Sequence, residues 1–440
     1  MNLRTSLSAA TALVAALSTG AVAAPAGDAV TLWNANAATA AMKACITPTG
    51  DGDPFHESRL YAIMHIAIHD AMNAIDRKYQ PHTYDTKADS GASPDAAVAA
   101  AAHDVLVPLI GQLPPYLVKQ ECIDAGVASA NAAYTAALAN IPDNPAKQQG
   151  ITVGQASAAA ILKARANDHG NDGPFVNKDC PKGVEPGKYQ CTPGTPFVVF
   201  EKWEFVTPFV LQDTAQFRPG PPYAVASAEF KKDLEEVKTL GGDGKKTPSA
   251  RTPDQTQIAL FWWEASPIKW NRIARTVSAD KGLSAAENAR LFAVLNMALA
   301  DGYIAMAASK NHYSFWRPIT AVQTSGGDPA WTPLMGTPPD QDYPSGHSIQ
   351  GGVGAEVLKQ VFGSDQVSFK DCNGAGLPDG STCYGATPVT RSYTSFTQAA
   401  DENGYSRVLV GFHFHNATDV GTAYGRKIGE RAAGMLPPIK

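Results

Sequence analysis

The stretch KNHYSFWRP at residues 310–318 follows a predicted helix over residues 289–309, and two shorter motifs come after it. PSGH occupies residues 344–347, and SRVLVGFH occupies residues 406–413. The three motifs supply three cations, a hydroxyl, a glycine amide and two imidazoles, carried by Lys310, Arg317, Ser345, Gly346, His347, Arg407 and His413. This inventory suits a tetrahedral oxyanion of high charge, such as phosphate or vanadate, with one histidine left over for chemistry.

The two cations of the first motif would bind an oxyanion in different ways. Arg317 can bind two oxygens at once through its planar guanidinium group, whereas Lys310 acts as a point charge. Pro318 and the aromatic residues before Arg317 predict that the helix ends between the two cations, which lets both converge. Taken alone, a lysine and an arginine seven residues apart are more often solvated charges.

The second motif lies at the predicted start of a helix over residues 348–362. Free backbone N–H groups and the helix dipole favour an anion beside Ser345, and Gly346 lets the backbone approach closely. His347, in the first turn, would face the anion as a general acid or base. A plain serine N-cap is the competing interpretation.

The third motif needs a break in the helix to bring its two functional residues together. Arg407 and His413 lie six residues apart, so they would point to different sides of an unbroken helix. Gly411 offers that break, and His413 could then bond covalently to the central atom of the anion. The alternative is a buried structural histidine between two phenylalanines.

Apolar residues at helical spacing predict an all-α fold of two helical bundles. The predicted helices cover residues 57–75, 95–110, 121–139, 144–166, 227–240, 251–277 with a break near Pro267, and 289–309. Residues 168–222 are rich in Gly, Pro and aromatic side chains, and we expect them to connect an N-terminal bundle (24–167) to a C-terminal bundle (223–440) that carries the anion site. In the first helix, His65 and His69 could share a metal, but no third ligand is suitably spaced, which favours structural roles.

The start of the chain predicts export. Arg4 precedes an apolar run over residues 9–22, and a small-residue site predicts cleavage after Ala23, so residues 1–23 form a signal peptide. No later segment predicts a stable membrane span, so the mature protein would be soluble in the periplasm or outside the cell. The net charge of −5 and the lack of a basic block argue against nucleic-acid binding.

The six cysteines fit an oxidising compartment. Local pairing across two loops is the simplest arrangement, and it leaves one long-range pair. The expected disulfides are therefore Cys180–Cys191, Cys372–Cys383 and Cys45–Cys122, with the other pairings still open.

Lys-x6-Arg-Pro, Pro-Ser-Gly-His and Ser-Arg-x5-His, in this order, resemble the signature of type 2 phosphatidic acid phosphatases and vanadium-dependent haloperoxidases. Phe-Trp-Arg-Pro, the long helical region before it and the 58 residues between His347 and Ser406 are more similar to the haloperoxidase branch. The resemblance implies two helical bundles with the anion site in the second. It implies that His413 is the vanadate ligand, or the phosphorylated nucleophile of a phosphatase, and that His347 is the acid/base residue. The equatorial oxygens would be held by Lys310, Arg317, Ser345, Gly346 and Arg407.

Several positions depart from the family pattern. Ala417 stands four residues after His413, where the phosphatases have an aspartate. Asp419 instead lies four residues after His415, so the residue that orients His413 stays open. Ala307 and Asp340 replace two aromatic residues of fungal chloroperoxidases, and a carboxylate near the site would repel halide.

The leading hypothesis is therefore an exported vanadate-dependent haloperoxidase that oxidises bromide or iodide, rather than chloride, with hydrogen peroxide. An exported acid phosphatase, acting on a phosphate ester through phosphorylated His413, is the alternative, and a non-catalytic oxyanion-binding protein is a third. Glu264 is a candidate partner for one of the site arginines. The oligomeric state stays open, a homo-oligomer included.

Overall fold

The computed structural model describes residues 27–46, 52–173, 175–181, 185–372 and 389–439. The fold is all-α with two helical bundles, as predicted, and it adds two short antiparallel strand pairs, β1 with β2 and β3 with β4. The helices are α1 (Ala29–Lys43), α2 (Pro54–Ile75), α3 (Pro94–Gly111), α4 (Gln120–Ala139), α5 (Pro145–Ala164), η1 (Glu201–Phe205), α6 (Ala228–Leu240), α7 (Pro253–Phe261), α8 (Ser266–Lys281), α9 (Ala285–Tyr313), α10 (Pro318–Thr324), α11 (Gly346–Phe362), α12 (Phe396–Leu409) and α13 (His415–Ala433). The strands are β1 (Val176–Asn177), β2 (Val198–Val199), β3 (Phe369–Cys372) and β4 (Thr390–Tyr393).

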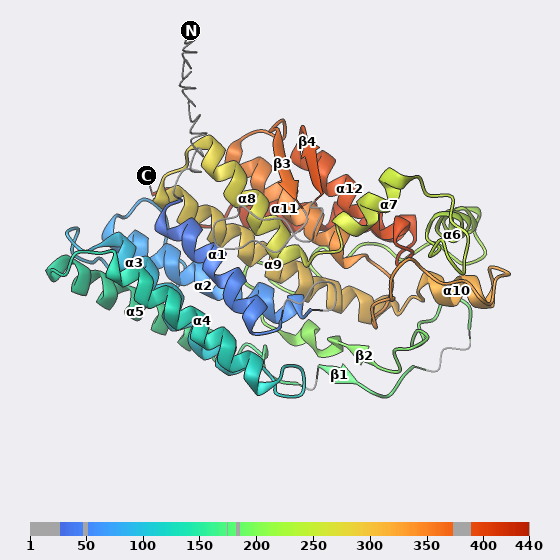
Figure 1. Cartoon of the computed structure of the whole chain (residues 1–440), viewed down its shortest axis with the longest axis horizontal. Helices are drawn as coiled ribbons and strands as arrows, with labels where there is room; N and C mark the ends of the chain where they lie inside the picture. The colour runs from blue at the N-terminus through green and yellow to red at the C-terminus, as the bar shows by residue number, and fades with distance from the viewer. Residues whose placement is uncertain (1–26, 47–51, 174, 182–184, 373–388, 440) are drawn as a thin grey trace, which may run out of the picture.

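Helices α1 to α5 lie together on one side of the molecule, drawn from blue to green in Figure 1. Helix α3 packs against α2, α4 and α5, and its run of alanines lets the neighbouring backbones approach closely. A Cβ atom at Gly154 of α5 would lie only 2.3 Å from the carbonyl oxygen of Ala97. Small side chains therefore determine how closely α3 and α5 pack.

Helix α9 lies at the centre of the fold, with α2 on one side and α11 and α13 on the other (Figure 1). It begins with a capping box formed by Ser284 and Glu287 and ends at Tyr313, and its C-cap Ser314 has a left-handed φ of 47°. Helices α3 and α9 are the two described helices that are long and apolar enough to cross a membrane. The apolar window of α9 is wholly buried in protein, so its position in the core accounts for its composition.

The C-terminal bundle is built around α11, which packs against α9, α12 and α13. The contact between α11 and α13 depends on glycines, since a Cβ atom at Gly425 would lie 2.0 Å from the carbonyl oxygen of Ile349. Helices α6, α7, α8 and α10 lie around this bundle, with α6 and α10 at the end far from α3 and α5 (Figure 1). The start of α11 and the end of α9 thereby meet inside the second bundle.

Several helices differ from the prediction. Helix α1 was not predicted, because its polar residues interrupt an apolar stripe and are themselves buried, Asn34 among them. The segment predicted as helical over 251–277 with a break near Pro267 forms α7 and α8; the break lies at residues 262–265, and Pro267 is in the first turn of α8. Helix α11 begins at Gly346, two residues earlier than predicted.

Two of the expected disulfides, Cys45–Cys122 and Cys180–Cys191, are confirmed. Cys372 is also disulfide-bonded, but its expected partner Cys383 lies outside the described residues. His65 and His69 are buried, and each has its own hydrogen-bond partner: Asn34 Nδ2 for His65 and the Gln80 carbonyl oxygen for His69. Both contacts fit structural roles.

The Gly/Pro-rich connection is attached to α2, to the end of α5 and to α9. Near the N-terminal end of the connection, Asp168 forms ion pairs with Arg59 of α2 and with Arg165, the C-cap of α5, each at 2.9 Å. Further on, the carboxylate of Asp301 in α9 accepts three backbone N–H groups at 2.7–2.8 Å, from Phe209, Val210 and Leu211. Between these points, the Tyr189 N–H donates to the Ser314 carbonyl oxygen at 2.8 Å. The connection therefore covers the C-terminal end of α9, where Lys310 lies.

Candidate active site

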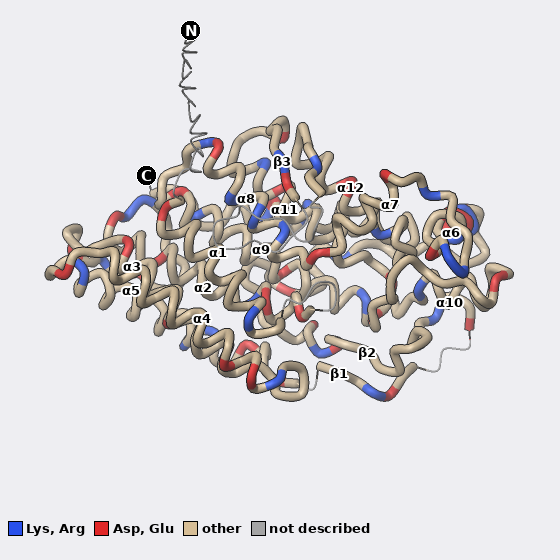
Figure 2. The backbone as a smooth tube through the Cα atoms, in the orientation of Figure 1, with Lys and Arg blue, Asp and Glu red and all other residues tan. Residues whose placement is uncertain are grey.

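Charged residues of both signs gather beside α8, α9 and α11 in the middle of the fold (Figure 2). The two cations of the first motif face one carboxylate. Lys310 Nζ lies 2.6 Å from Oδ2 of Asp340 and 2.5 Å from the Gln341 carbonyl oxygen. Arg317 forms an ion pair with the other oxygen of Asp340, and its Nε donates to the Asp340 carbonyl oxygen at 2.7 Å. The left-handed Ser314 ends α9 between the two cations, as the convergence predicted from sequence requires.

The charge state of this group follows from its burial. Burial, opposed by Asp340, lowers the pKa of Lys310 to about 8, so the ammonium is mostly charged at neutral pH. Burial also opposes ionisation of Asp340, but Lys310 and Arg317 outweigh it and hold the pKa of the carboxyl below its ordinary value. The three side chains therefore form an ionised cluster.

Arg407 contributes the third cation from α12. Its Nη1 donates to the Trp262 carbonyl oxygen at 3.3 Å, and its guanidinium group lies 5.0 Å from the centre of the Phe412 ring. Its Nε is buried and has no hydrogen-bond partner within the described part of the chain. Because a buried N–H without an acceptor is costly, this donor indicates a ligand that supplies one.

His413 is oriented by Asp342, which the sequence analysis did not identify. His413 Nδ1 lies 2.9 Å from Asp342 Oδ1, and Nε2 lies 2.9 Å from Nη1 of Arg317. Because Arg317 can only donate, the lone pair is on Nε2 and the proton is on Nδ1, against Asp342. Burial, opposed by Arg317 and Lys310, raises the pKa of Asp342 to about 8, so its carboxyl group is largely protonated at neutral pH. The sequence did contain one indication that Asp342 lies near the site, because it is only three residues before Ser345 of the second motif.

Gly411 supplies the break that brings His413 into the site. Its φ is +86°, and a Cβ atom there would lie 2.6 Å from the Gly241 carbonyl oxygen. Helix α12 ends at Leu409 and α13 begins at His415, so His413 lies in the turn between them. The competing residue in this motif, His415, instead pairs with Glu236 at 2.8 Å on the outer side of α13.

The second motif forms the start of α11. Ser345 is the N-cap, and its hydroxyl accepts from Ser348 Oγ at 2.9 Å rather than capping the helix, so it stays available to a ligand. A Cβ atom at Gly346 would lie 2.4 Å from Sδ of Met306, which explains glycine where α11 crosses α9. His347 Nε2 lies 3.3 Å from the Glu264 carbonyl oxygen.

Electrostatic effects connect these residues. The pKa of His413 is lowered by burial and then by Arg317, Lys310, Arg407 and His347. The pKa of His347 is lowered by burial and then by Arg407. Both imidazoles are thus neutral at neutral pH, and the three motifs meet in one place.

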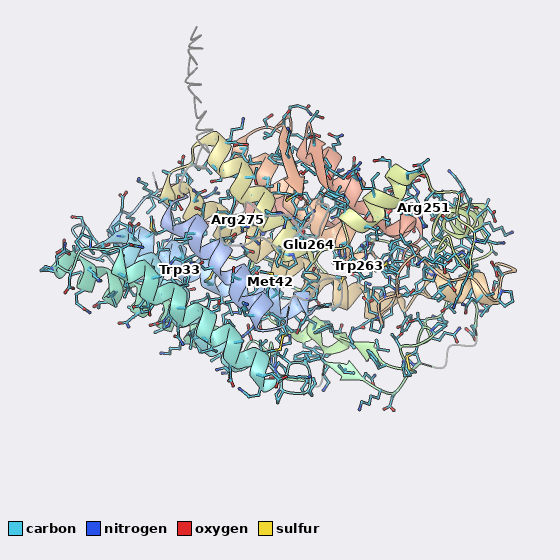
Figure 3. The ribbon with its side chains drawn as sticks, in the orientation of Figure 1. Trp33, Met42, Arg251, Trp263, Glu264 and Arg275 are labelled. Carbon is cyan, nitrogen blue, oxygen red and sulfur yellow. A yellow bond between two sulfur atoms is a disulfide. The ribbon has the colours of Figure 1, made fainter. Side chains whose placement is uncertain are left out.

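Glu264 is not the partner of a site arginine. Figure 3 shows it beside Trp263, in the turn between α7 and α8. Its carboxylate accepts two bonds from Arg272, at 2.7 and 2.6 Å, and lies 3.6 Å from Lys269. The prediction was wrong because Arg272, eight residues later, lies two turns along α8 on the side that faces Glu264.

Tyr189 is a further residue near the site that sequence analysis missed. Its hydroxyl is buried without a hydrogen-bond partner among the described residues. Burial and then Asp340 raise its pKa, which places the hydroxyl within the electric field of the cation cluster. No sequence motif marks it, since it lies in the irregular connection.

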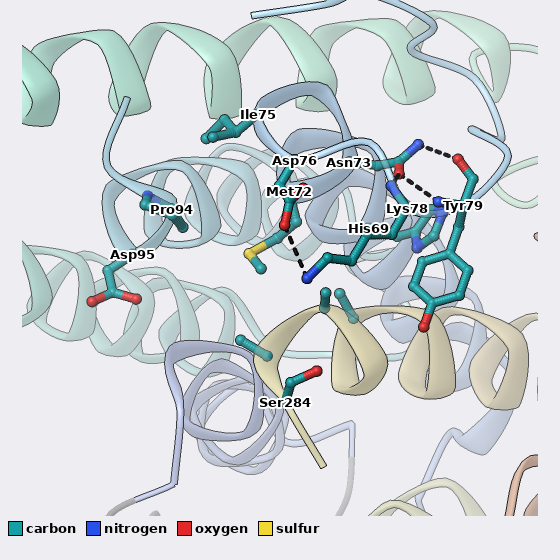
Figure 4. A pocket seen from close by; sticks show the side chains of 13 residues that line it. His69, Met72, Asn73, Ile75, Asp76, Lys78, Tyr79, Pro94, Asp95 and Ser284 are labelled. Carbon is teal, nitrogen blue, oxygen red and sulfur yellow. Dashed lines mark hydrogen bonds and ion pairs between the residues drawn. The ribbon is translucent and has the colours of Figure 1, made fainter. Parts of the chain in front are cut away.

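A separate cavity of about 330 Å³ opens at the other end of α9 (Figure 4). It is lined by residues that include Met72, Lys78, Tyr79, Asp95 and Ser284. Lys78 is paired there with Asp76 at 2.9 Å. The cavity has no residue in common with the anion site.

Comparison with known proteins agrees with this geometry. Residues 290–437 match the family model described as the VCPO second helical-bundle domain, a range that contains all three motifs. This chain is therefore similar, in the region that carries the three motifs, to the second helical-bundle domain of that family. It is 28% identical to vanadium chloroperoxidase from Curvularia inaequalis over 175 residues, which are 33% of this chain and 29% of that protein. The match therefore spans less than a third of the length of that relative.

Solved structures of this family share the fold over most of the chain. A bacterial vanadium-dependent iodoperoxidase is 24% identical, with a TM-score of 0.74, and the match covers 94% of this chain and 97% of that one. A bacterial vanadium-dependent chloroperoxidase in its apo form is 14% identical, with a TM-score of 0.67, over 86% of this chain and 91% of that one. These similarities extend the shared fold to the N-terminal bundle.

Proposed function

We propose that the chain is a vanadate-dependent haloperoxidase that oxidises halide with hydrogen peroxide. The observation that carries the proposal is the arrangement around His413. Its Nε2 lone pair points toward cationic side chains while Nδ1 is held by Asp342. A structural histidine needs no such set of cations, whereas a ligand of an oxyanion's central atom does.

The side chains present fit vanadate. When bound, vanadate would supply a Lewis-acidic centre that activates hydrogen peroxide. His413 Nε2 would hold its central atom, and the unpartnered Nε of Arg407 would donate to an oxygen. The remaining equatorial oxygens would be held by Lys310, Arg317, Ser345 and Gly346. Each hydrogen bond from a charged donor contributes about 1.5–3 kcal/mol.

His347 would move the proton. It is half-buried, while Lys310 and Arg407 are almost fully buried, so His347 lies nearer to solvent than the cations. A neutral imidazole can take a proton from hydrogen peroxide as it binds and return one to the oxidised halide product. The Glu264 carbonyl oxygen, 3.3 Å from Nε2, orients the ring.

Asp340 and the first solved relative both favour a heavier halide. The Asp340 carboxylate at Lys310 repels any halide that approaches this side of the site. This repulsion is most serious for chloride, because chloride is harder to oxidise than bromide or iodide. The structurally similar protein with the higher TM-score is described as an iodoperoxidase. We therefore propose bromide or iodide as the substrate.

Export and the domain division are further proposals. Two disulfides are consistent with an oxidising compartment, periplasmic or extracellular. The proposed division is a signal peptide (1–23), an N-terminal bundle (24–167), a connection (168–222) and a C-terminal bundle (223–440).

The test is an assay of purified mature protein with and without orthovanadate. Bromide, iodide and chloride oxidation by hydrogen peroxide would be measured beside hydrolysis of a phosphomonoester. We expect halide oxidation only with vanadate, abolished in His413→Ala and retained in the matched variant His415→Ala. Phosphomonoester hydrolysis that vanadate inhibits, without halide oxidation, would instead support the phosphatase.

A further inference from the structure

We infer that the Asp340 carboxylate is an internal anion that occupies the Lys310–Arg317 side of the oxyanion site and weakens oxyanion binding. The inference rests on the proposed oxyanion site. It goes beyond the proposed function because it assigns Asp340 control over how tightly the site holds its ligand. The carboxylate contacts both cations, at 2.6 Å from Lys310 Nζ and in an ion pair with Arg317.

Backbone carbonyl groups hold the two cations in position. Lys310 Nζ also donates to the Gln341 carbonyl oxygen at 2.5 Å. Arg317 donates from Nε to the Asp340 carbonyl oxygen at 2.7 Å and from Nη1 to the Phe412 carbonyl oxygen at 3.0 Å. These three acceptors are backbone atoms, so they remain when the side chain of Asp340 is changed. The carboxylate is therefore not needed to hold the cations in place.

The Asp340 carboxylate also lowers the net positive charge of the site. Lys310, Arg317 and Arg407 contribute three positive charges, and Asp340 removes one of them. A bound oxyanion would lie within a few ångströms of the carboxylate, since both contact the same donors. Two like charges at such a distance, in a partly buried site, repel by an amount that corresponds to about a ten- to hundredfold change in affinity.

The carboxylate of Asp340 can also move toward solvent. Its side chain is 15% exposed, whereas those of Lys310 and Arg317 are 3% and 1% exposed. Asp340 also lies in the irregular segment between α10 and α11, where its own backbone is not part of a helix. An arriving oxyanion can thus displace the carboxylate toward solvent and take its place on Lys310 and on Nη2 of Arg317.

Calorimetric titration with orthovanadate and with inorganic phosphate tests the inference. Asp340→Asn keeps the size of the side chain and removes its charge, and we expect it to bind both ions at least tenfold more tightly than the unchanged protein. The matched control is Glu204→Gln. Glu204 is a partly buried carboxylate beside the site that accepts from Asn311 at 2.9 Å and has no contact with the cations. Its affinities should stay within about twofold of those of the unchanged protein.

Other outcomes separate the inference from the proposed function. Equal or weaker binding by a folded Asp340→Asn protein would show that the carboxylate positions the cations, and the inference would fail while the oxyanion site stands. Absence of binding in both proteins would remove the oxyanion site itself, and the inference with it. Binding by the variant alone would support the inference strongly. Asp340→Ser, checked by its thermal unfolding, serves if the asparagine variant does not fold.

Discussion

Asp342→Asn is the most direct test of how His413 is prepared for its ligand. The substitution keeps the shape of the side chain but replaces its carboxyl group with an amide. The bond it changes, from His413 Nδ1 to Asp342 Oδ1, is 2.9 Å long, and the two side chains are 5% and 0% exposed. Water therefore cannot easily replace the lost partner. An asparagine amide can also turn its N–H₂ group toward Nδ1, which would favour the tautomer with the proton on Nε2.

The size of the effect follows from this bond. Leaving a buried donor without its partner costs about 1–3 kcal/mol, and about 1.4 kcal/mol corresponds to a tenfold change in affinity. Partners that orient a ligating histidine alter metal affinity or activity by about 10- to 100-fold. We therefore expect Asp342→Asn to bind orthovanadate about 10- to 100-fold more weakly, with at least as large a loss of halide oxidation.

Calorimetric titration with orthovanadate and a peroxide-dependent bromide assay measure these losses. Glu236→Gln is the matched control, because Glu236 makes the same kind of contact, at 2.8 Å, with the neighbouring His415. The reasoning would be refuted by an Asp342→Asn protein that binds vanadate within twofold of the unchanged chain. A large loss in Glu236→Gln would instead show that His415 is the ligand.

Three further changes test other parts of the structure. His347→Ala should lower halide oxidation, measured by steady-state kinetics, by about 10²- to 10⁴-fold. The vanadate affinity, measured by titration, should change by less than about threefold. Equal losses of activity and affinity would contradict a proton-transfer role. Asp168→Asn leaves Arg59 and Arg165 without their shared carboxylate and should lower the free energy of unfolding by about 3–5 kcal/mol in denaturant titrations at pH 7. Ion pairing with Arg59 and Arg165 outweighs burial and holds the pKa of Asp168 below its ordinary value of 3.8, so this stabilisation is present above about pH 4 and is lost as the pH falls through the lower folded-state pKa. A difference between the two proteins that does not shrink as the pH is lowered toward acid unfolding would refute it. Tyr189→Phe removes a buried hydroxyl that has no hydrogen-bond partner among the described residues, so the thermal stability should stay unchanged or rise. Vanadate binding should weaken about two- to tenfold. A clear loss of stability would show that the hydroxyl has a structural partner.

The fold was largely predictable because its signals are local. Helical spacing of apolar residues, the capping box at Ser284 and the Asn144–Pro145 start of α5 each act within a few residues. Helix α1 was missed because its polar face is buried: Asn34 bonds to His65 and Asn271, partners that are 31 and 237 residues away. A local pattern cannot distinguish such a face from one exposed to water.

By itself, the sequence determined which chemical groups the site contains: the cations, the two imidazoles, the helix start at Ser345 and the glycine that breaks the chain before His413. Only the tertiary structure decided which carboxylates those groups meet. Asp342 is 71 residues from His413, and Asp340 is 30 and 23 residues from Lys310 and Arg317. Such pairs form when packing of α9, α10 and α12 brings distant segments together, and a buried charge then takes the partner that lies within reach.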